Sequence, residues 1–192
     1  MEDQELAVTL AAAVRGDASA FAVLWRAHQP ALLRYLRVIV GENAEDVASE
    51  TWLQTARDLR GFSGSAAGFR VWLFTIARNR AIDERRRARR RPEEPHDLSE
   101  KDLPGRRPDV ADEVVRQSET DWALSVIATL PKDQAEAVTL RIVAGLDVAQ
   151  TAQVLGKRAG AVRVAAMRGL RRLAEHAEVR ARWQESRRGE GV

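Results

Sequence analysis

Cysteine is absent from this chain of 192 residues. Its absence excludes disulfide bonds and thiolate metal sites, and nothing in the composition favours an oxidising compartment. The three histidines, His28, His96 and His176, lie far apart in the sequence and lack metal-ligand spacing. A glycine-rich phosphate-binding motif ending in Lys-Ser or Lys-Thr is also missing. We therefore expect no metal, no cofactor and no enzymatic activity, which disfavours a small nuclease.

Long apolar runs are likewise missing. None approaches the roughly 20 residues that a membrane-spanning helix requires. The N-terminal segment MEDQELAVTLAAAVRGD begins with acidic residues and lacks the basic leader and apolar core of a secretion signal. The sequence therefore predicts a soluble, cytoplasmic protein with no membrane insertion.

Glycine and proline are scarce, and the aromatic residues are five Trp, four Phe and one Tyr. Ala, Leu, Arg and Glu dominate instead, and most of these residues have high helix propensity. No run of alternating apolar and polar residues is long enough to predict a strand. These features predict an all-α fold with two small helical domains joined by a flexible linker.

The prolines gather between two helical segments. Residues 92–117 contain four of the six prolines and many acidic residues, a composition typical of a linker without a fold of its own. The sequence thus divides into a first domain (1–91), this linker (92–117), a second domain (118–178) and a tail (179–192). About 25 extended residues reach on the order of 80 Å, which exceeds two turns of duplex DNA at about 34–36 Å each.

Helix signals organise the first domain. We expect helices over 2–14 and from a cap at Asp17 to Gly41, with Pro30 kinking or interrupting the second. Asn43 is placed to cap the next helix, and residues 60–68 are expected to form a loop. His28 is expected at the helix surface or the core edge. The predicted buried residues are Phe21, Leu24, Trp25, Leu32, Leu33, Leu36 and Ile39, then Ala48, Trp52, Ala56 and Leu59, and finally Phe69, Trp72, Leu73, Ile76 and Ala77.

Charge is distributed in blocks, although the net charge is only +3. Residues 78–91 hold eight arginines against two acids, residues 92–121 hold ten acids against four bases, and bases predominate again over 157–182. Clustered arginines bind phosphates by releasing counterions. Two basic blocks separated by an acidic one therefore predict two nucleic-acid contacts.

The second basic block has the outline of a helix-turn-helix. Asp147 can cap the short helix VAQTAQVL, Gly156 ends it, and the turn GKRA leads into GAVRVAAMRGLRRLAEHA. The preceding helix has Pro131 in its first turn and should bury Val138 and Ile142. On the last helix, Val162, Ala166, Leu170 and Leu173 are expected to face inward, and Arg163, Val164, Met167, Arg168, Arg171 and Arg172 outward.

The outward residues of the last helix suit two kinds of DNA contact. Arg163 and Val164 lie near its start, where a recognition helix meets base edges, and an arginine there can pair with both acceptors of a guanine. Arg171 and Arg172 lie farther along and are placed to hold phosphates. A plainer interpretation is a helical hairpin with a solvated basic face. The earlier arginine block could also be a membrane-surface patch, but it lacks a matching exposed apolar face.

A resemblance to a known family is carried by three segments, which begin at Asn43, Phe69 and Leu130: NAEDVASETWLQTARDL, FRVWLFTIARNRAIDERRRAR and LPKDQAEAVTLRIVAGLDVAQTAQVLGKRAGAVRVAAMRGLRRL. Together they resemble the extracytoplasmic-function (ECF) sigma factors of bacterial RNA polymerase, within the sigma-70 superfamily. The first segment is similar to the helix that grips the clamp of the core enzyme. The second is similar to the stretch that melts and reads the minus-ten promoter element. The third is similar to the domain that reads the minus-thirty-five element.

The resemblance implies an alternative sigma factor whose partners are core RNA polymerase, promoter DNA (duplex and single non-template strand) and an anti-sigma factor. The implied polymerase contacts are Asp46, Val47, Ser49, Glu50 and Trp52. The implied minus-ten contacts are Phe69, Trp72, Arg78, Asn79, Arg85 and Arg86, with Asn79 beside a flipped base. The implied minus-thirty-five contacts are Arg163, Val164, Met167, Arg168 and Arg171.

Three residues depart from the family pattern. Ser49 stands where Gln is usual, Ala159 where Ser or Thr often caps the recognition helix, and Ala165 where a polar or basic residue is common. Loss of a helix cap costs about 1 kcal/mol. The alternative function is a two-domain transcriptional regulator that uses the same helix-turn-helix to bind duplex DNA without polymerase.

Overall fold

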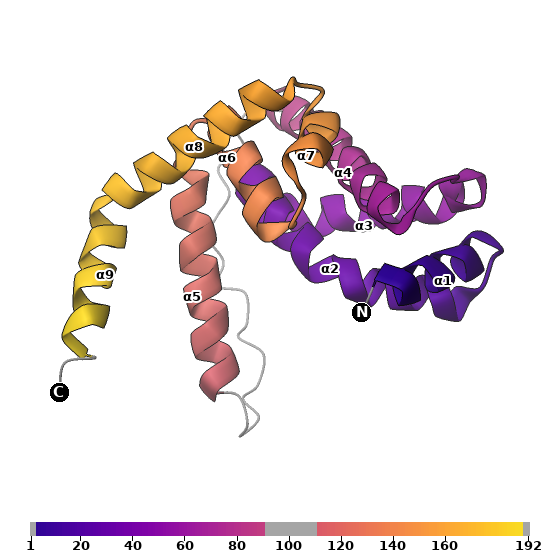
Figure 1. The fold of residues 1–192 in the computed structure, drawn as a ribbon, viewed down its shortest axis with the longest axis horizontal. Helices are drawn as coiled ribbons and strands as arrows, with labels where there is room; N and C mark the ends of the chain where they lie inside the picture. Colours follow the sequence, from indigo (N-terminus) through magenta and orange to yellow (C-terminus); the bar gives the residue numbers. More distant parts are fainter. Residues whose placement is uncertain (1–2, 91–110, 190–192) are drawn as a thin grey trace.

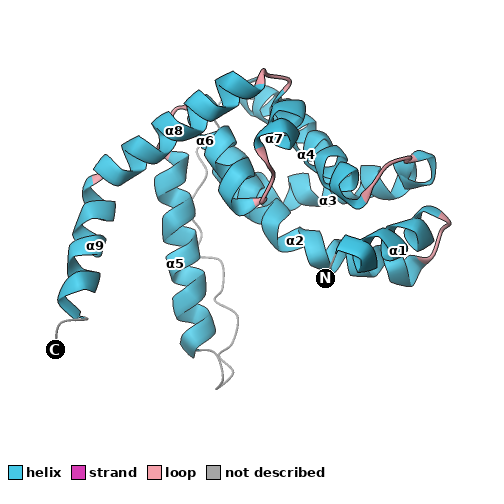
Figure 2. Ribbon diagram, viewed as in Figure 1, coloured by secondary structure: helices cyan, strands magenta, loops and turns pink. Residues whose placement is uncertain are grey.

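Every regular element in the described part of the chain is helical, which confirms the all-α prediction (Figure 1, Figure 2). The computed structural model describes residues 3–90 and 111–189. The N-terminal unit (3–90) contains α1 (Asp3–Val14), α2 (Ala18–Val40), η1 (Gly41–Asn43), α3 (Ala44–Asp58), η2 (Leu59–Gly61) and α4 (Ala66–Arg90). The C-terminal unit (111–189) contains α5 (Ala111–Ala128), α6 (Lys132–Val138), the π-helical turn η3 (Thr139–Val143), α7 (Val148–Leu155), α8 (Ala159–Glu175) and α9 (Ala177–Gly189). Within these two ranges, no helix is both long and apolar enough to cross a bilayer.

The long helix α2 lies at the centre of the N-terminal unit. The Asp17 carboxylate caps it by accepting hydrogen bonds from the backbone N–H groups of Ser19 and Ala20 at 2.8 and 3.1 Å. Gly41 ends the helix at a φ of +62°, a conformation that glycine adopts without strain. Both predicted boundaries are therefore confirmed. The buried face of α2 carries Leu24, His28, Leu32, Tyr35 and Leu36.

Several predictions for this unit need correction. Pro30 lies inside α2, which runs unbroken from Ala18 to Val40, so the predicted interruption does not occur. Apolar burial on both sides of Pro30 outweighs one missing backbone hydrogen bond. Trp25 is 41% exposed, because it lies about 100° around the helix from Leu24. Asn43 makes no capping hydrogen bond to α3. Its side-chain amide instead donates to Glu84 Oε1 at 2.9 Å.

The loop before α4 is shorter than predicted. Ser65 Oγ accepts a hydrogen bond from the backbone N–H of Gly68 at 3.1 Å, as a helix N-cap does, and α4 therefore begins at Ala66. In the preceding helix α3, Ala56 is exposed and Thr55 is buried in its place. The Thr55 hydroxyl donates to the carbonyl of Thr51 at 2.8 Å, which satisfies this polar group inside the core.

The C-terminal unit starts with α5 at Ala111, inside the segment that composition assigned to the linker. Residues 91–110 of that segment lie outside the described ranges. Farther on, the π-helical turn η3 corrects the prediction for Ile142, which is 63% exposed, whereas Val138 is buried. Its wider turn, closed by the Ala144 N–H and the Thr139 carbonyl at 3.0 Å, moves Ile142 away from the Val138 face.

The helix-turn-helix prediction is confirmed in outline. Asp147 and Gln150 form a reciprocal capping box at the start of α7, and Gly156 ends that helix with a φ of +62°. In α8, Gly169 rather than Leu170 faces the core, and Leu170 is exposed. A Cβ at Gly169 would lie 2.7 Å from Val138 Cγ2. Glycine at this position thus lets α8 approach α6 closely and shifts the line of contact off Leu170.

The two units share one apolar core. Leu140, Leu146, Leu155 and Val162 of the C-terminal unit belong to the same buried cluster as Leu36, Phe69 and Leu73 of the N-terminal unit. Val38 of α2 also packs against a second cluster that contains Leu130 and Val138. Helix α7 packs against α4, and α6 packs against α2 (Figure 1). Helices α4 and α8, the two basic helices, therefore belong to a single packed body.

The tail is helical, which the sequence did not predict. Helix α9 turns away from the end of α8 and runs beside α5 (Figure 1). Trp122 of α5 joins them: its indole Nε1 donates to Glu178 Oε2 at 3.2 Å, and the Arg182 guanidinium lies 4.2 Å from its ring centroid. These contacts are exposed at Glu178 and Arg182. They orient α9 without adding to the apolar core.

Replacing Gly169 tests the close approach of α8 to α6. Gly169→Ala should lower the free energy of unfolding by about 1–2 kcal/mol, because overpacking against Val138 exceeds the roughly 1 kcal/mol helix preference for Ala. Thermal unfolding followed by circular dichroism measures the change. The matched control is Gly160→Ala in the same helix, where no atom lies within 4 Å of the new Cβ. This control should raise stability by up to about 1 kcal/mol, and stabilisation by both substitutions would contradict the close approach.

Candidate polymerase and nucleic-acid interfaces

An aromatic rim lies at the start of α4. The rings of Phe62, Phe69 and Trp72 have centroids 5.0–5.9 Å apart. Phe69 is completely buried, whereas Phe62 and Trp72 are partly exposed. The predicted DNA contact at Phe69 is therefore corrected: this ring supports the other two from beneath. The exposed parts of Phe62 and Trp72 are the surfaces on which an unpaired base can stack.

The loop that leads into α4 holds the rim in place. A Cβ at Gly64 would lie 2.8 Å from Cζ of Phe62, so glycine allows the ring to pack directly on the loop backbone. The cap at Ser65 fixes where α4 starts, and with it the position of Trp72 relative to Phe62. The aromatic rim is thus positioned by local backbone contacts as well as by the core.

The middle of α4 carries two predicted DNA contacts in different settings. Asn79 is exposed and available to a ligand. Arg78 has a side chain only 19% exposed, and its Nε lies 3.5 Å from Oε1 of Glu136 in α6. The Glu136 side chain is only 1% exposed. In this arrangement the Arg78 guanidinium therefore pairs with the C-terminal unit.

The last turns of α4 form an arginine ridge, defined as Arg85, Arg86, Arg87, Arg89 and Arg90. Arg86 pairs with Asp83 at 3.8 Å. Arg87 lies between Glu84 at 3.7 Å and Glu50 of α3 at 3.6 Å. Ion pairs with this exposure contribute little stability, so a phosphate can replace the carboxylates. Arg91, the end of the predicted ridge, lies outside the described residues.

Helix α3 presents only part of its predicted polymerase contacts. Asp46, Ser49 and Glu50 are exposed. Val47 and Trp52 are buried, and their predicted role at the surface is corrected to one in the core. Trp52 packs edge-on against Phe21 with centroids 5.9 Å apart, and its Nε1 donates to Gln29 Oε1 at 2.6 Å. These contacts hold α3 against α2 and so fix the direction in which its exposed face points.

Leu53 belongs to the exposed face of α3, and the sequence analysis missed it. Its large apolar side chain is solvent-exposed and follows Ser49 and Glu50 by four and three residues, the spacing of neighbours on a helix surface. That spacing was the available signal. The face therefore combines carboxylates, a hydroxyl and one apolar side chain.

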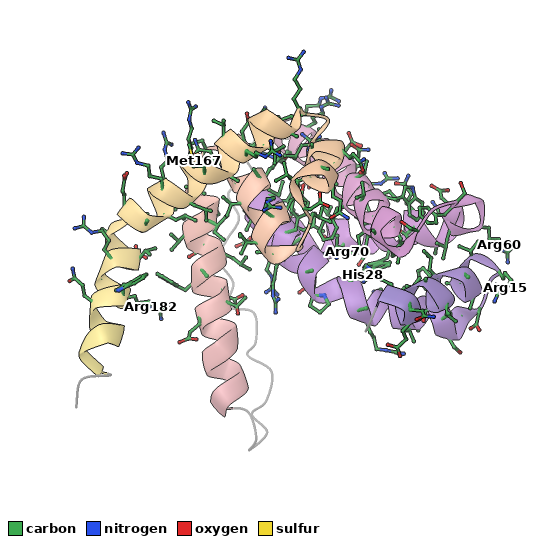
Figure 3. All side chains as sticks on the ribbon, in the orientation of Figure 1. Arg15, His28, Arg60, Arg70, Met167 and Arg182 are labelled. Atoms are coloured by element: carbon green, nitrogen blue, oxygen red, sulfur yellow. The ribbon has the colours of Figure 1, made fainter. Side chains whose placement is uncertain are left out.

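Helix α8, the predicted recognition helix, exposes every residue predicted to face outward. Arg163, Val164, Met167, Arg168, Arg171 and Arg172 are all exposed. Figure 3 shows Met167 on the side of α8 that points away from the rest of the C-terminal unit. Arg171 also pairs with Glu175 at 3.0 Å, an exposed and weak contact. The outer face of α8 is thus long, basic and uncovered.

The start of α8 lacks a side-chain cap. The N-cap residue is Arg158, one residue before the predicted position Ala159, and it makes no capping hydrogen bond. Lys157 Nζ instead pairs with Asp133 Oδ1 at 2.9 Å, and this hydrogen bond lowers the pKa of Asp133. The turn before α8 is thereby tied to the start of α6. Ala165, the other departure, is half-buried and packs against the core, so the structure gives it a packing role.

Arg70 makes a second polar contact between the units. Its Nη2 donates a hydrogen bond to the backbone carbonyl of Ala144, just after η3. His28 lies nearby in α2, and Figure 3 shows both side chains in the centre of the molecule. Burial, reinforced by the positive charge of Arg70, lowers the pKa of His28 to about 4. The His28 ring also packs 5.4 Å from Phe69, so this neutral histidine belongs to the core beneath the aromatic rim.

Glu136 and Arg70 were not predicted from the sequence. Nothing in the spacing of either residue points to a partner so far along the chain, and only the packing of the two units brings the partners together. In the described ranges, no three His, Cys, Asp or Glu residues are arranged to hold a metal ion.

The depressed pKa of His28 makes stability depend on pH. Between pH 7 and pH 5 the unfolded chain, with its ordinary histidine pKa of 6.5, takes up a proton that the folded chain excludes. Acidification should therefore lower the free energy of unfolding by about 2 kcal/mol over this range. Urea unfolding at pH 7, 6 and 5 measures it. His28→Gln should flatten the dependence and His176→Gln should retain it, whereas an unchanged slope in His28→Gln would contradict the assignment.

Comparison with known proteins adds to this geometry. The family model of Sigma-70 region 2 matches residues 24–91, and that of Sigma-70 region 4 matches residues 120–173. The structure of CnrH in complex with the cytosolic domain of CnrY superimposes with a TM-score of 0.62 at 23% identity, covering 88% of this chain and 94% of that one. That likeness concerns the fold.

Curated relatives carry the comparison further. The ECF RNA polymerase sigma factor ShbA of Streptomyces griseus is 34% identical over 86% of this chain and 92% of its own length. SigD of Mycobacterium tuberculosis is 34% identical over 90% and 84%. BldN of Streptomyces coelicolor is 36% identical over 83% of this chain, which spans 61% of BldN. Matches of this extent, in the order region 2 then region 4, show that the chain belongs to the ECF family of RNA polymerase sigma factors.

Proposed function

We propose that this chain is an alternative sigma factor that binds core RNA polymerase and directs promoter-specific transcription initiation. The observation that carries the proposal is a pair of exposed basic helical surfaces, on α4 and α8, located in the segments that match Sigma-70 regions 2 and 4. An acidic segment separates the two in sequence, so the basic residues form two distinct blocks.

Helix α3 provides the contact with the polymerase clamp. Its exposed face offers the carboxylates of Asp46 and Glu50, the hydroxyl of Ser49 and the apolar side chain of Leu53. A patch of this kind suits a specific protein–protein contact, because the apolar group supplies burial and the charges supply orientation. Ser49 is shorter than the Gln usual in the family and forms a weaker contact there.

The minus-ten element is melted and read on α4. Extruding a base costs a few kcal/mol of stacking and pairing, and stacking on an aromatic side chain returns about 1–3 kcal/mol per base. Phe62 and Trp72 offer that stacking surface, Asn79 offers hydrogen bonds to a base edge, and the arginine ridge holds the strand's phosphates. Favourable contacts with the opened strand thereby offset the cost of opening the duplex.

The minus-thirty-five element is read by α8 in the major groove. Arg163 lies near the helix start, where its guanidinium can pair with both acceptors of a guanine. Val164 and Met167 offer apolar contacts to thymine methyl groups. Arg168 and Arg171 hold phosphates, which fixes the register without reading sequence.

Core polymerase is the scaffold that lets both contacts act together. Two weak contacts on one scaffold raise each other's effective concentration, so the free chain binds promoters poorly. The chemistry of RNA synthesis belongs to the polymerase, and the chain acts in the cytoplasm without being an enzyme itself. An anti-sigma factor would block initiation by covering the exposed faces of α3 and α4.

A stand-alone regulator of duplex DNA is the second candidate function. It is favoured by the outer face of α8, whose outward residues are all exposed. It leaves the exposed face of α3 and the aromatic rim without a role, and the sigma proposal accounts for both.

Transcription in vitro with core polymerase and a genomic DNA library tests the proposal, with start sites mapped in the presence and absence of the chain. New start sites should appear only with the chain. Arg163→Ala should then reduce transcription from these sites about 10- to 100-fold, because a bidentate base contact contributes about 1–3 kcal/mol.

The matched control is Arg180→Ala, which removes an exposed arginine from α9, and it should leave transcription unchanged within about twofold. An absence of new start sites would contradict the sigma proposal. Tight, sequence-specific promoter binding by the chain without polymerase would favour the stand-alone regulator instead.

A further inference from the structure

We infer that Glu136 is a latch that holds the C-terminal unit over the DNA-contacting side of α4, so that the free chain rests in a closed form that must open before promoter binding. This inference rests on the proposed function. The interaction surface is the α4 and α2 side of the N-terminal unit, and its partner is the C-terminal unit of the same chain.

The charges show how the latch closes. The Glu136 carboxylate is almost completely removed from solvent and pairs with Arg78 at 3.5 Å. The same carboxylate acts on Tyr35 of α2, where burial, followed by the negative charge of Glu136, raises the pKa of the phenol. Arg78 and Tyr35, the two residues that interact with the Glu136 charge here, both lie in the N-terminal unit. In a separated C-terminal unit, Glu136 would lose these neighbours.

Arg78 links the latch to DNA binding. It lies next to the exposed Asn79 on α4 and belongs to the basic block that is proposed to hold the opened strand. A carboxylate beside an arginine neutralises the charge that would attract a phosphate. Glu136 thus competes with DNA for Arg78, and the closed form withholds one minus-ten contact.

Other contacts hold the same interface closed. The Arg70 guanidinium donates to the carbonyl of Ala144, and α7 packs against α4. Arg37 of α2 pairs with Asp121 of α5 at 3.1 Å at the edge of the interface. Leu140, Leu146 and Leu155 fill the centre of the shared core. The closed form is therefore a continuous interface with one buried ion pair inside it.

The geometry of a promoter requires this interface to separate. The names of the minus-ten and minus-thirty-five elements give their positions, which are about 25 base pairs apart. At about 34–36 Å per helical turn, this separation is roughly 85 Å along the duplex. Side chains of α4 and the C-terminal unit that touch within one core cannot serve both elements at once. About 20 residues lie between α4 and α5, and when extended they span on the order of 65 Å, which together with the helices accommodates an open form.

The buried pair suits an interface that opens. Neither Glu136 oxygen nor Arg78 Nε has a hydrogen-bond partner of good geometry among the described residues. For such a pair the loss of hydration offsets much of the attraction between the charges, so separation, which restores water to both groups, costs less than the attraction alone would require. Removing one partner is different, because it leaves an uncompensated charge in the closed form alone.

Distances between spin labels measure the closing equilibrium directly. The chain has no native cysteine, so Ala56→Cys on α3 and Ala174→Cys on α8, both at exposed positions, provide unique label sites. The full-length free chain should show mainly one short distance. Glu136→Gln should increase the long-distance population roughly tenfold, since the substitution strands the Arg78 charge.

The matched control is Asp121→Asn, which breaks an exposed ion pair at the same interface. It should change the populations by less than about twofold. A charge-swapped chain, with Arg78→Glu and Glu136→Arg together, should recover much of the short-distance population that either reversal alone loses. Loss of closure in the single reversals and its recovery in the swap identify a direct pair and exclude simple misfolding.

Each result decides the inference. A wild-type chain that is already mainly open, or a Glu136→Gln chain with wild-type distances, would overturn the latch. Populations that shift as expected support it. The matching functional readout is the concentration of chain that gives half-maximal transcription with core polymerase, which should fall several-fold in Glu136→Gln, because apparent affinity scales with the open fraction.

The latch and the proposed function fail in distinguishable ways. If Glu136→Gln opens the chain but no chain yields new start sites with polymerase, the latch stands and the sigma role fails. If wild type initiates transcription but Glu136→Gln alters neither the distances nor the half-maximal concentration, the sigma role stands and the latch fails.

Discussion

Helix α4 buries one face in the core and exposes the opposite face to a ligand, and the packing of the rest of the structure depends on this separation of the two faces. Phe69, Leu73 and Ala77 are completely buried, and α1, α2 and α3 pack around them to complete the N-terminal unit. The ligand-facing side then inherits its geometry from the core. Trp72 is held by Phe69 beneath it and by Phe62 beside it, and Asn79 projects from a helix that cannot rotate without breaking that packing. Rigid support of this kind is what positions a binding residue to a fraction of an ångström.

The role of each arginine depends on how deeply its side chain is buried as well as on its position in the sequence. Most arginines of the ridge and of α8 remain exposed, and the ion pairs of Arg86 and Arg171 are exposed and weak, so their charge is available to phosphates. Arg70 and Arg78 point inward and contact the C-terminal unit instead. The same residue type thus binds an external ligand at one position and an internal one at another, and burial decides which.

Local signals predicted much of the fold. Caps at Asp17 and Asp147 and the glycines at 41 and 156 set helix ends through contacts within a few residues, and each could be read from spacing. Tertiary contacts decided the rest. Asn43 turned to Glu84, Leu170 was displaced by the glycine beside it, and the π-helical turn moved Ile142, none of which a helical period reveals. At the candidate surfaces, the outward residues of α8 followed from periodicity, whereas Val47, Trp52 and Phe69 proved buried because a family motif also includes the residues that support a surface.

The shared core of the two units has a consequence for competition. A protein whose binding-competent form is a minor species has its affinity reduced in proportion to that fraction. Sigma factors that compete for a limited amount of polymerase would therefore differ in apparent affinity partly through the fraction of each that is in the open form. This effect is separate from the quality of their contacts with the enzyme. A single buried carboxylate could in this way set the threshold abundance at which a whole set of genes is switched on.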